Sequence, residues 1–387
     1  MELMGYQREN GTFGIRNHLL IIPASVCAVE VAGRIAAQIG AVSLPHQHGC
    51  CQMGEDFRQT VRTLTGFGKN PNVGAVLVVG LGCEGIQAAQ IAQEIQITGK
   101  PVEYITIQEC GGTTKTVARG VSIGEKFTEI LSSANKVPFS LKHLILGMEC
   151  GGSDPTSGIV ANPAIGIASD QLISCGGSSI LSETTEVIGA ENILAKRFLD
   201  LNQRDRFLAM VADVEKRALS VGEDLRGSQP TPGNIQGGLS TIEEKSLGCM
   251  HKAGDTTPFL GALAYGEMVP TQNPGLYFMD SPGEDIDSIT GMVAGGAQLI
   301  VFTTGRGTPT GCPIAPVIKI TGNPQTYETM EENIDINGGK VILGESSLKE
   351  LGQEIFEKMK AVANGEETKA EKLGHREFGI YRIGYTF

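Results

Sequence analysis

The sequence predicts an α/β protein, and two observations carry this prediction. Short apolar runs, of which residues 74–80 (GAVLVVG) are the clearest, alternate along the chain with longer segments of helical periodicity. The chain has 387 residues, well above the size at which a single hydrophobic core usually stops growing. We therefore expect a Rossmann-like N-terminal domain with a parallel sheet, followed by a second, less regular α/β domain.

The first domain is expected to contain four strands that alternate with helices. The strands are predicted at residues 18–23, 41–44, 74–80 and 102–107. The helices are predicted up to about Gly40 and at residues 55–66, 85–98 and 114–134. Strands separated by helices of this length are typical of βαβ units, whose parallel sheet is covered by helices on both faces.

The second domain is expected to begin after a polar stretch at residues 132–140. We place the boundary near residue 138, which gives domains at residues 1–138 and 139–387. Its predicted elements are strands at 141–147, 276–279, 298–303 and 316–321, and helices at 190–220 and 346–364. Glycine is abundant, with 52 residues, which indicates either many tight strand-to-helix turns or backbone held close to a ligand.

Composition and charge exclude several classes of function. The net charge of −12 opposes binding to nucleic acid, because affinity for that polyanion comes from Lys and Arg side chains. No apolar run reaches the ~18 residues of a membrane-spanning helix, and the N-terminus lacks the basic and apolar segments of a signal peptide. Nine cysteines without CxxC spacing argue against a disulfide framework. We expect a cytoplasmic protein that binds neither nucleic acid nor a membrane.

Chemically active side chains gather where the predicted strands end. In an open parallel sheet, ligands bind beyond the carboxyl ends of the strands. The corresponding segments carry most of the cysteines, two of the six histidines and several acids, and they span residues 46–51, 81–84, 108–114, 149–154 and 182–185. This coincidence of position and chemistry predicts that the site lies at these strand ends.

Residues 46–51 (HQHGCC) are the densest of these segments. Imidazole and thiol groups are ligands that favour Zn or Fe over Mg or Ca. We predict a ligand or catalytic role for His46, His48 and Cys50, against the alternative of a glycine turn with buried, inert thiols. Cys83 and Cys150 each end a strand beside a glutamate. They are predicted as further metal ligands, although a cysteine in such a position is more often a small core residue.

Two arginines and several carboxylates complete the candidates. Arg16 lies just before the first strand and Arg306 lies between two glycines, and each could present a bidentate fork to a carboxylate. Three carboxylates are possible acid–base groups or ligands, but a helix cap or a turn explains each more simply: Glu183, Asp280 and Asp335. Lys245 is expected to be an ordinary residue of a helix surface.

Motifs spread over almost the whole chain resemble, in order, those of one known family. They are GYQRENG (5–11), GIRN (14–17), NPN (70–72), GLGCE (80–84), CGGSD (150–154), LSET (181–184), PGN (232–234), GGA (295–297) and FTTGRG (302–307). In these motifs the chain is similar to the altronate/galactarate dehydratases. The resemblance implies a hydro-lyase that removes water from a small anionic sugar acid to give a 2-keto-3-deoxy acid. It also implies a divalent metal cofactor, Fe(II) or Mn(II).

The same resemblance implies roles for the candidate residues. A metal bound to the substrate carboxylate acidifies the C2 proton, a base removes that proton, and an acid protonates the leaving C3 hydroxyl. The candidates for base and acid are His46, His48 and Glu84, and the sequence leaves open which is which. Arg16 or Arg306 would hold the substrate carboxylate.

Family members begin with a small SAF-type domain, whereas Met1 here falls almost on the start of the GYxRxxG motif. We therefore expect a separate small SAF-domain subunit that acts in trans, within an oligomer. Two alternatives stay open. One is the large subunit of a (2R)-sulfolactate sulfo-lyase, which would eliminate sulfite and is expected to lack the His/Cys cluster. The other is a non-catalytic scaffold subunit that binds a metal or a ligand.

Overall fold

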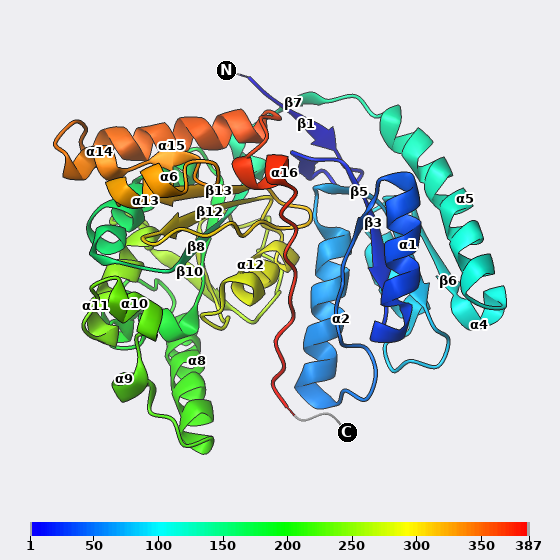
Figure 1. Cartoon of the computed structure of the whole chain (residues 1–387), viewed down its shortest axis with the longest axis horizontal. Coiled ribbons are helices and arrows are strands. Elements are labelled where there is room, and N and C mark those ends of the chain that lie inside the picture. The colour runs from blue at the N-terminus through cyan, green and yellow to red at the C-terminus, as the bar shows by residue number, and fades with distance from the viewer. Residues whose placement is uncertain (1, 385–387) are drawn as a thin grey trace.

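The computed structural model describes residues 2–384, which form two parallel β-sheets covered by helices and a small antiparallel sheet (Figure 1). The predicted α/β class is confirmed. The first sheet belongs to the N-terminal part of the chain, and the second to the part that follows residue 140.

The first sheet has four parallel strands. In spatial order they are β4 (Val42–Ser43), β3 (His18–Pro23), β5 (Val73–Gly80) and β6 (Val102–Thr106). All eight residues of β5 are buried, because helices cover both faces. Leu77 and Val79 face α1 (Val29–Ile39) and α5 (Thr113–Ser132), whereas the alternate residues Val76 and Val78 face α2 (Gly54–Lys69) and α3 (Ala88–Gln96).

The second sheet has seven parallel strands, so this half is more regular than its sequence indicates. In spatial order they are β10 (Phe259–Leu263), β11 (Leu276–Met279), β9 (Ser178–Leu181), β8 (Ile145–Gly151), β12 (Leu299–Thr304), β13 (Val317–Thr321) and β14 (Ile336–Asn337). The chain proceeds from β8 to β9, β10 and β11 on one side, and then returns to β12 on the other. The strand order therefore reverses between β8 and β12, which is where open α/β sheets bind ligands.

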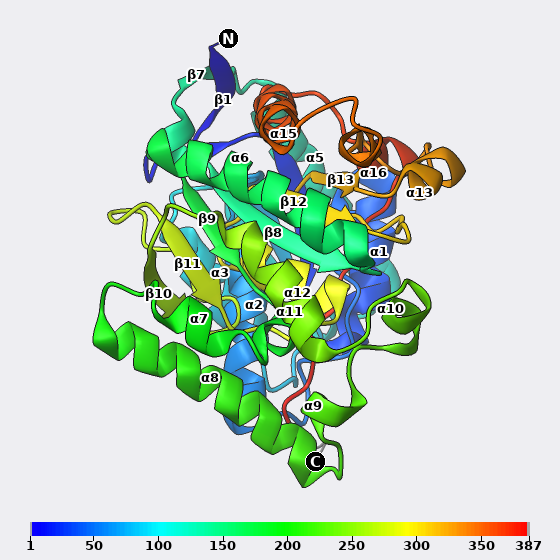
Figure 2. The same ribbon diagram turned by 90° about the vertical axis from the view of Figure 1, so that its left-hand side faces the viewer.

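Helices cover both faces of the second sheet. Figure 2 shows α6 (Asn162–Ser174) lying across one face, where α15 (Leu348–Ala363) packs against it. On the other face, α12 (Asp285–Ala294) contacts α2 of the first half. Apart from α7 (Glu191–Ala195) and α8 (Leu201–Ser220), the other α-helices of the described residues are α4 (Ile107–Cys110), α9 (Leu225–Ser228), α10 (Pro232–Gln236), α11 (Ile242–Cys249), α13 (Pro324–Thr329), α14 (Gly339–Ile342) and α16 (Lys369–Leu373).

The single helix predicted at residues 190–220 is two helices, α7 (Glu191–Ala195) and α8 (Leu201–Ser220). Phe198 is buried between them and stacks on Phe259 with ring centroids 4.8 Å apart. Asp200 then caps α8, because its carboxylate accepts a hydrogen bond from the backbone N–H of Asn202 at 2.7 Å. The buried Phe198 ring and the Asp200 N-cap therefore divide the predicted helix into two.

A continuous apolar core joins the two halves, with α2 and α12 between the two sheets. The side chain of Asn70 donates hydrogen bonds to the carbonyls of Val293 and Ala297, both at 2.9 Å. The small antiparallel sheet contains β2 (Phe13–Gly14), β1 (Leu3–Gln7) and β7 (Val137–Phe139). The boundary predicted near residue 138 falls within β7, and the division into two domains stays a prediction.

The C-terminal segment returns from the second half to the first. Residues 374–384, drawn in red, run between the two halves and along α2 (Figure 1). Across residues 2–384, no helix has both the length and the apolar composition needed to cross a membrane.

Candidate active site

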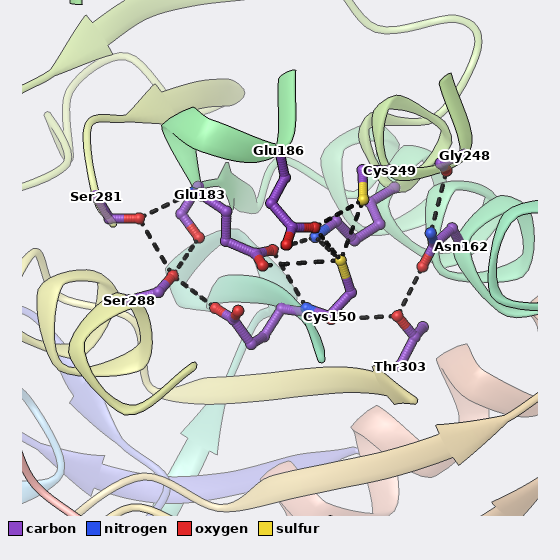
Figure 3. A network of polar contacts seen from close by, with 12 residues as sticks. Cys150, Asn162, Glu183, Glu186, Gly248, Cys249, Ser281, Ser288 and Thr303 are labelled. Carbon is purple, nitrogen blue, oxygen red and sulfur yellow. Dashed lines mark hydrogen bonds and ion pairs between the residues drawn. The ribbon is translucent and has the colours of Figure 1, made fainter. Parts of the chain in front are cut away.

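A buried polar cluster lies at the carboxyl ends of β8 and β9 (Figure 3). Its members come from the last residues of β8, the turn after β9, and α11 with the turn that follows it. All six are at most 5 % exposed, and they are Glu149, Cys150, Glu183, Glu186, Cys249 and Lys252. Open parallel sheets bind ligands at such strand ends, so this cluster is a candidate active site.

Glu183 adopts an unusual backbone conformation that helps to build the cluster. Its φ of 70° lies in the left-handed region, which residues other than glycine rarely occupy. The backbone N–H of Glu183 bonds to Ser281 Oγ at 2.8 Å, and its carboxylate accepts from the backbone N–H of Cys150 at 3.2 Å. Neighbouring groups on β8 and after β11 therefore hold Glu183 in this conformation.

Cys150, Glu186 and Cys249 form the one group of three potential metal ligands found within residues 2–384. Their ligand atoms all lie within 4.8 Å of one another. The two sulfur atoms are 3.3 Å apart, and Glu186 Oε2 lies 3.2 Å from Cys150 Sγ and 2.9 Å from Cys249 Sγ. Two thiols and one carboxylate are a donor set that suits Zn or Fe(II).

Two lysines balance the negative charge of the cluster. Lys252 forms an ion pair with Glu183, and its Nζ lies 2.9 Å from Cys150 Sγ. Lys245, seven residues earlier and on α11, forms an ion pair with Glu186 and has a side chain only 11 % exposed. The prediction that Lys245 is an ordinary surface residue is therefore wrong, because its ammonium faces the cluster.

Burial and neighbouring charges shift the pKa of the cluster groups in opposite directions. Burial raises the pKa of Glu183, and burial together with the charge of Glu183 raises the pKa of Glu149 well above its usual range. Burial alone would raise the pKa of Glu186, but the ammonium groups of Lys245 and Lys252 outweigh it and lower that pKa. These shifts favour the protonated form of Glu149 and the anionic form of Glu186.

Asp285 extends the cluster from the first turn of α12. The Asp285 carboxylate packs directly against Gly151 at the end of β8. A Cβ atom added to Gly151 would lie 2.4 Å from Asp285 Oδ2. Burial, and then the charges of Glu183 and Glu186, raise the pKa of Asp285 to about 7. Such a group exchanges protons readily at neutral pH.

A cavity of about 250 Å³ opens beside the cluster. Lys245 and Cys249 form part of its wall, together with Ser153 and Asn162. The hydroxyl of Ser153 is buried and has no hydrogen-bond partner among the described residues. The cavity therefore offers a cation and one unsatisfied hydroxyl group to a small polar ligand.

The predicted His46 and His48 lie at the carboxyl end of the first sheet, with ring centroids 6.2 Å apart. Both ring nitrogens of His46 are occupied, because Nδ1 accepts from the His48 N–H at 3.1 Å and Nε2 lies 2.7 Å from the Pro23 carbonyl. His48 Nε2 contacts the Ile380 carbonyl at 2.5 Å, and its Nδ1 is buried without a partner. His48 thus keeps a free nitrogen, whereas His46 does not.

The other residues predicted in this region are spread over its surface and loops. Cys50 and Cys83 are exposed, and Cys50 Sγ lies 3.8 Å from the sulfur of Cys51. One carboxylate oxygen of Glu84 accepts from the N–H groups of Leu81 and Gly82, and the other is buried without a partner. Of the five predicted metal ligands, the structure places Cys150 alone in the group of three, so the predicted ligand set stays a prediction.

Both predicted arginines have partners within the chain. Arg16 forms a bidentate ion pair with Glu371, at 2.7 and 2.9 Å. Arg306 donates to the Gly233 carbonyl at 2.7 Å and to the side chain of Gln236. Arg306 is exposed, whereas the Arg16 side chain is only 12 % exposed and its guanidinium is already engaged. The predicted role in holding a substrate carboxylate therefore suits Arg306 better.

Sequence reasoning missed three members of the cluster, Glu186, Cys249 and Lys252. A signal for them exists in the spacing of residues 245, 249 and 252, since positions four and seven apart lie on one face of a helix. Two lysines and a cysteine on one helical face indicate that the three side chains could enter the same site.

Comparison with known proteins shows two matching family descriptions that together cover nearly the whole chain. Residues 5–132 match "D-galactarate dehydratase/Altronate hydrolase, second domain", and residues 141–386 match "D-galactarate/Altronate dehydratase, C-terminal". The sequence resemblance described above is thereby confirmed.

Individual relatives are similar over almost the full chain. The (2R)-sulfolactate sulfo-lyase subunit beta of Chromohalobacter salexigens is 40% identical, covering 98% of this chain and 97% of that subunit. The altronate dehydratase of Bacillus subtilis is 36% identical, covering 99% of this chain and 78% of that protein. The altronate dehydratase of Escherichia coli is 33% identical, covering 100% of this chain and 78% of that protein. These relatives are named as lyases, and the chain belongs to the D-galactarate/altronate dehydratase family.

Proposed function

We propose that the chain is a metal-dependent hydro-lyase that dehydrates a sugar acid of the altronate or galactarate type to a 2-keto-3-deoxy acid. The observation that carries this proposal is the buried Cys150–Glu186–Cys249 group beside a cavity at the carboxyl ends of β8 and β9, in a chain of the dehydratase family. The cytoplasmic location stays a prediction.

The three ligands fit a divalent cation by charge as well as by geometry. Metal binding deprotonates thiol ligands, so Cys150, Glu186 and Cys249 would together present three negative charges to a divalent cation. Two sulfur donors favour Fe(II) over Mn(II), because Mn(II) prefers oxygen ligands. When bound, the metal would supply Lewis-acid chemistry that acidifies the C2 proton of the substrate.

The protein's own groups would bind and orient the sugar acid. Lys245 lines the cavity, and its ammonium group would attract the substrate carboxylate against the negative net charge of the chain. Lys252 forms a buried ion pair with Glu183 and also contacts Cys150 Sγ. These contacts would keep the charged groups around Cys150 in fixed positions. Asp285, with a pKa near 7, is a candidate to hold or release a proton.

The acid–base roles predicted for His46, His48 and Glu84 stay proposals for the first-sheet loops. His48 is the strongest of them, because its Nδ1 is free and unprotonated. Two substitutions distinguish the two locations. If the reaction takes place at the second-sheet cluster, Cys249→Ser abolishes turnover and His48→Ala does not. If the first-sheet loop carries the chemistry, His48→Ala lowers kcat about a hundredfold or more.

A second candidate function is that of a (2R)-sulfolactate sulfo-lyase subunit. The higher identity to that subunit, 40% against 36% for the altronate dehydratase of Bacillus subtilis, favours it. The relative's designation as subunit beta also supports the proposal that this chain works with a second, SAF-type subunit in trans and within an oligomer.

One assay separates these functions. The chain is incubated with altronate, galactarate or (2R)-sulfolactate, with and without the candidate small subunit, and 2-keto-3-deoxy acid and sulfite are measured separately. The proposal expects keto acid from a sugar acid after Fe(II) is added to chelator-treated protein. Sulfite would favour the second candidate, and the absence of both products in every combination would contradict both candidate functions.

A further inference from the structure

The two ring nitrogens of His48 have unequal environments. Nε2 lies 2.5 Å from the carbonyl oxygen of Ile380, which can only accept a hydrogen bond, so Nε2 carries the proton. Nδ1 then has a free lone pair, and it is buried with no partner among the described residues. His48 as a whole is 2 % exposed. A histidine whose other ring N–H donates to a backbone carbonyl is typical of sites where the free nitrogen acts on a ligand or a proton.

Ile380 belongs to the C-terminal segment, 332 positions away from His48. The segment is held on α2 next to this contact. The Asp56 carboxylate accepts hydrogen bonds from the Arg382 guanidinium at 2.9 Å and from the Ile383 N–H at 2.7 Å. The Gln59 side chain donates to the Tyr381 carbonyl at 2.8 Å. The residues that follow Ile380 are therefore anchored to the first turns of α2.

Asp56 is the central group of this anchor. It is 5 % exposed and lies in the first turn of α2, two residues after the helix begins. Its two oxygens accept from one side chain and from the backbone N–H groups of Ile383 and Gly384. Because an ionised carboxylate accepts such hydrogen bonds strongly, loss of its charge weakens several contacts to the segment at once.

We propose that Asp56 is a positioning residue: by anchoring residues 380–384, it holds the Ile380 carbonyl against His48 and keeps that imidazole in the Nε2–H form with Nδ1 free. The link to turnover rests on the catalytic role proposed for His48, whereas the link to the ring tautomer does not. A merely structural role for Asp56 would affect stability and leave the tautomer of His48 unchanged.

The test measures the histidine tautomers directly. The full-length protein is labelled with 15N-histidine, and two-bond 15N–1H correlation spectra identify which ring nitrogen carries the proton; a His48→Gln spectrum assigns the signal. The unchanged protein should show His48 with a protonated Nε2 and an unprotonated Nδ1. Asp56→Asn should convert His48 to an exchanging mixture of tautomers and lower kcat by about tenfold or more, with a smaller change in KM.

Two further variants keep the test decisive. Arg382→Met removes one partner of Asp56 and leaves the carboxylate in place, so it should shift the tautomer in the same direction but less, even if Asp56→Asn folds poorly. Glu55→Gln is the matched control, because this carboxylate on the same helical turn pairs with Arg58 and Arg62 instead. It should leave the His48 signal unchanged.

The outcomes separate the two proposals. An unchanged His48 signal in folded Asp56→Asn protein, or protonated Nδ1 in the unchanged protein, overturns the inference. A shifted tautomer with undiminished turnover supports the positioning role of Asp56 and refutes the catalytic role of His48. A shifted tautomer with reduced kcat supports both.

Discussion

The ammonium group of Lys252 lies 2.9 Å from the Cys150 sulfur and forms an ion pair with Glu183, and none of these three residues is more than 1 % exposed. A lysine in so buried a position is stable as a cation only because acidic groups surround it. Burial would lower its pKa, but Cys150 and Glu183 outweigh burial and raise that pKa well above the usual value. Lys252 is therefore part of the charge balance of the candidate metal site.

Replacement of Lys252 by methionine should be strongly destabilising. The substitution leaves Glu183 buried without its counter-ion, and breaking one partner from a buried pair typically costs about 3–5 kcal/mol. Urea denaturation of the metal-free protein measures the change. Lys340→Met is the control, because Lys340 is 45% exposed and lies 3.9 Å from Glu354, so its loss should change stability by about 0.5 kcal/mol or less. Equal effects of the two substitutions would contradict a charge-balancing role for Lys252.

Replacement of Cys249 by serine should remove bound metal while the fold persists. A serine hydroxyl is a much weaker ligand than a thiolate, so elemental analysis should show loss of iron, and a Co(II)-substituted sample should lose sulfur-to-cobalt charge-transfer absorption. Cys175→Ser is the matched control, because Cys175 is exposed after α6 and outside the cluster. Full retention of metal by Cys249→Ser would rule out the Cys150–Glu186–Cys249 site.

Much of the fold could be predicted because its signals are local. The eight buried residues of β5 form one valine-rich apolar run with a glycine near each end, and such a run can be recognised without knowledge of its neighbours. The break between α7 and α8 could not be predicted, because it depends on Phe198 stacking against Phe259, a contact between residues far apart in the sequence. Long-range packing overrides local periodicity there.

The candidate site was harder to predict than the fold for the same reason. Cys150 could be selected because it ends a strand, and strand ends are visible in the sequence. Its partners Glu186, Cys249 and Lys252 come from separate segments, and only the folded chain brings their side chains together. The HQHGCC segment predicts a site because two imidazoles and two thiols lie within six residues. In the structure, however, both ring nitrogens of His46 form local hydrogen bonds.

Acidification should destabilise the protein through His46. Burial, partly offset by the hydrogen bond to Pro23, lowers the pKa of His46 to about 4, whereas an unfolded histidine titrates near 6.5. Between these values the unfolded chain binds more protons, so the stability conferred by neutral His46 is fully present above pH 6.5 and is lost as pH falls toward 4. Between pH 7 and pH 5 this single group should contribute a loss of about 2 kcal/mol in the free energy of unfolding.

The His46→Gln variant isolates this contribution. Its free energy of unfolding should fall less between pH 7 and pH 5 than that of the unchanged protein, by about the same 2 kcal/mol, because glutamine does not titrate. Other buried histidines, such as His18, are present in both proteins and cancel in the comparison. Equal losses in the two proteins would show that His46 has no depressed pKa.

The contact between α2 and α12 should make Gly66 intolerant of a larger side chain. A Cβ added at Gly66 would lie 2.4 Å from the carbonyl oxygen of Ala294, so Gly66→Ala forces the two helices apart. Overpacking of this kind costs about 1–3 kcal/mol, and it should appear as a lower midpoint of urea denaturation. Gly33→Ala provides the contrast, because a Cβ at Gly33 in α1 meets nothing within 4 Å. It should stabilise the protein by up to about 1 kcal/mol through helix propensity. A stabilising effect at both positions would mean that the two halves of the chain do not pack rigidly through α2 and α12.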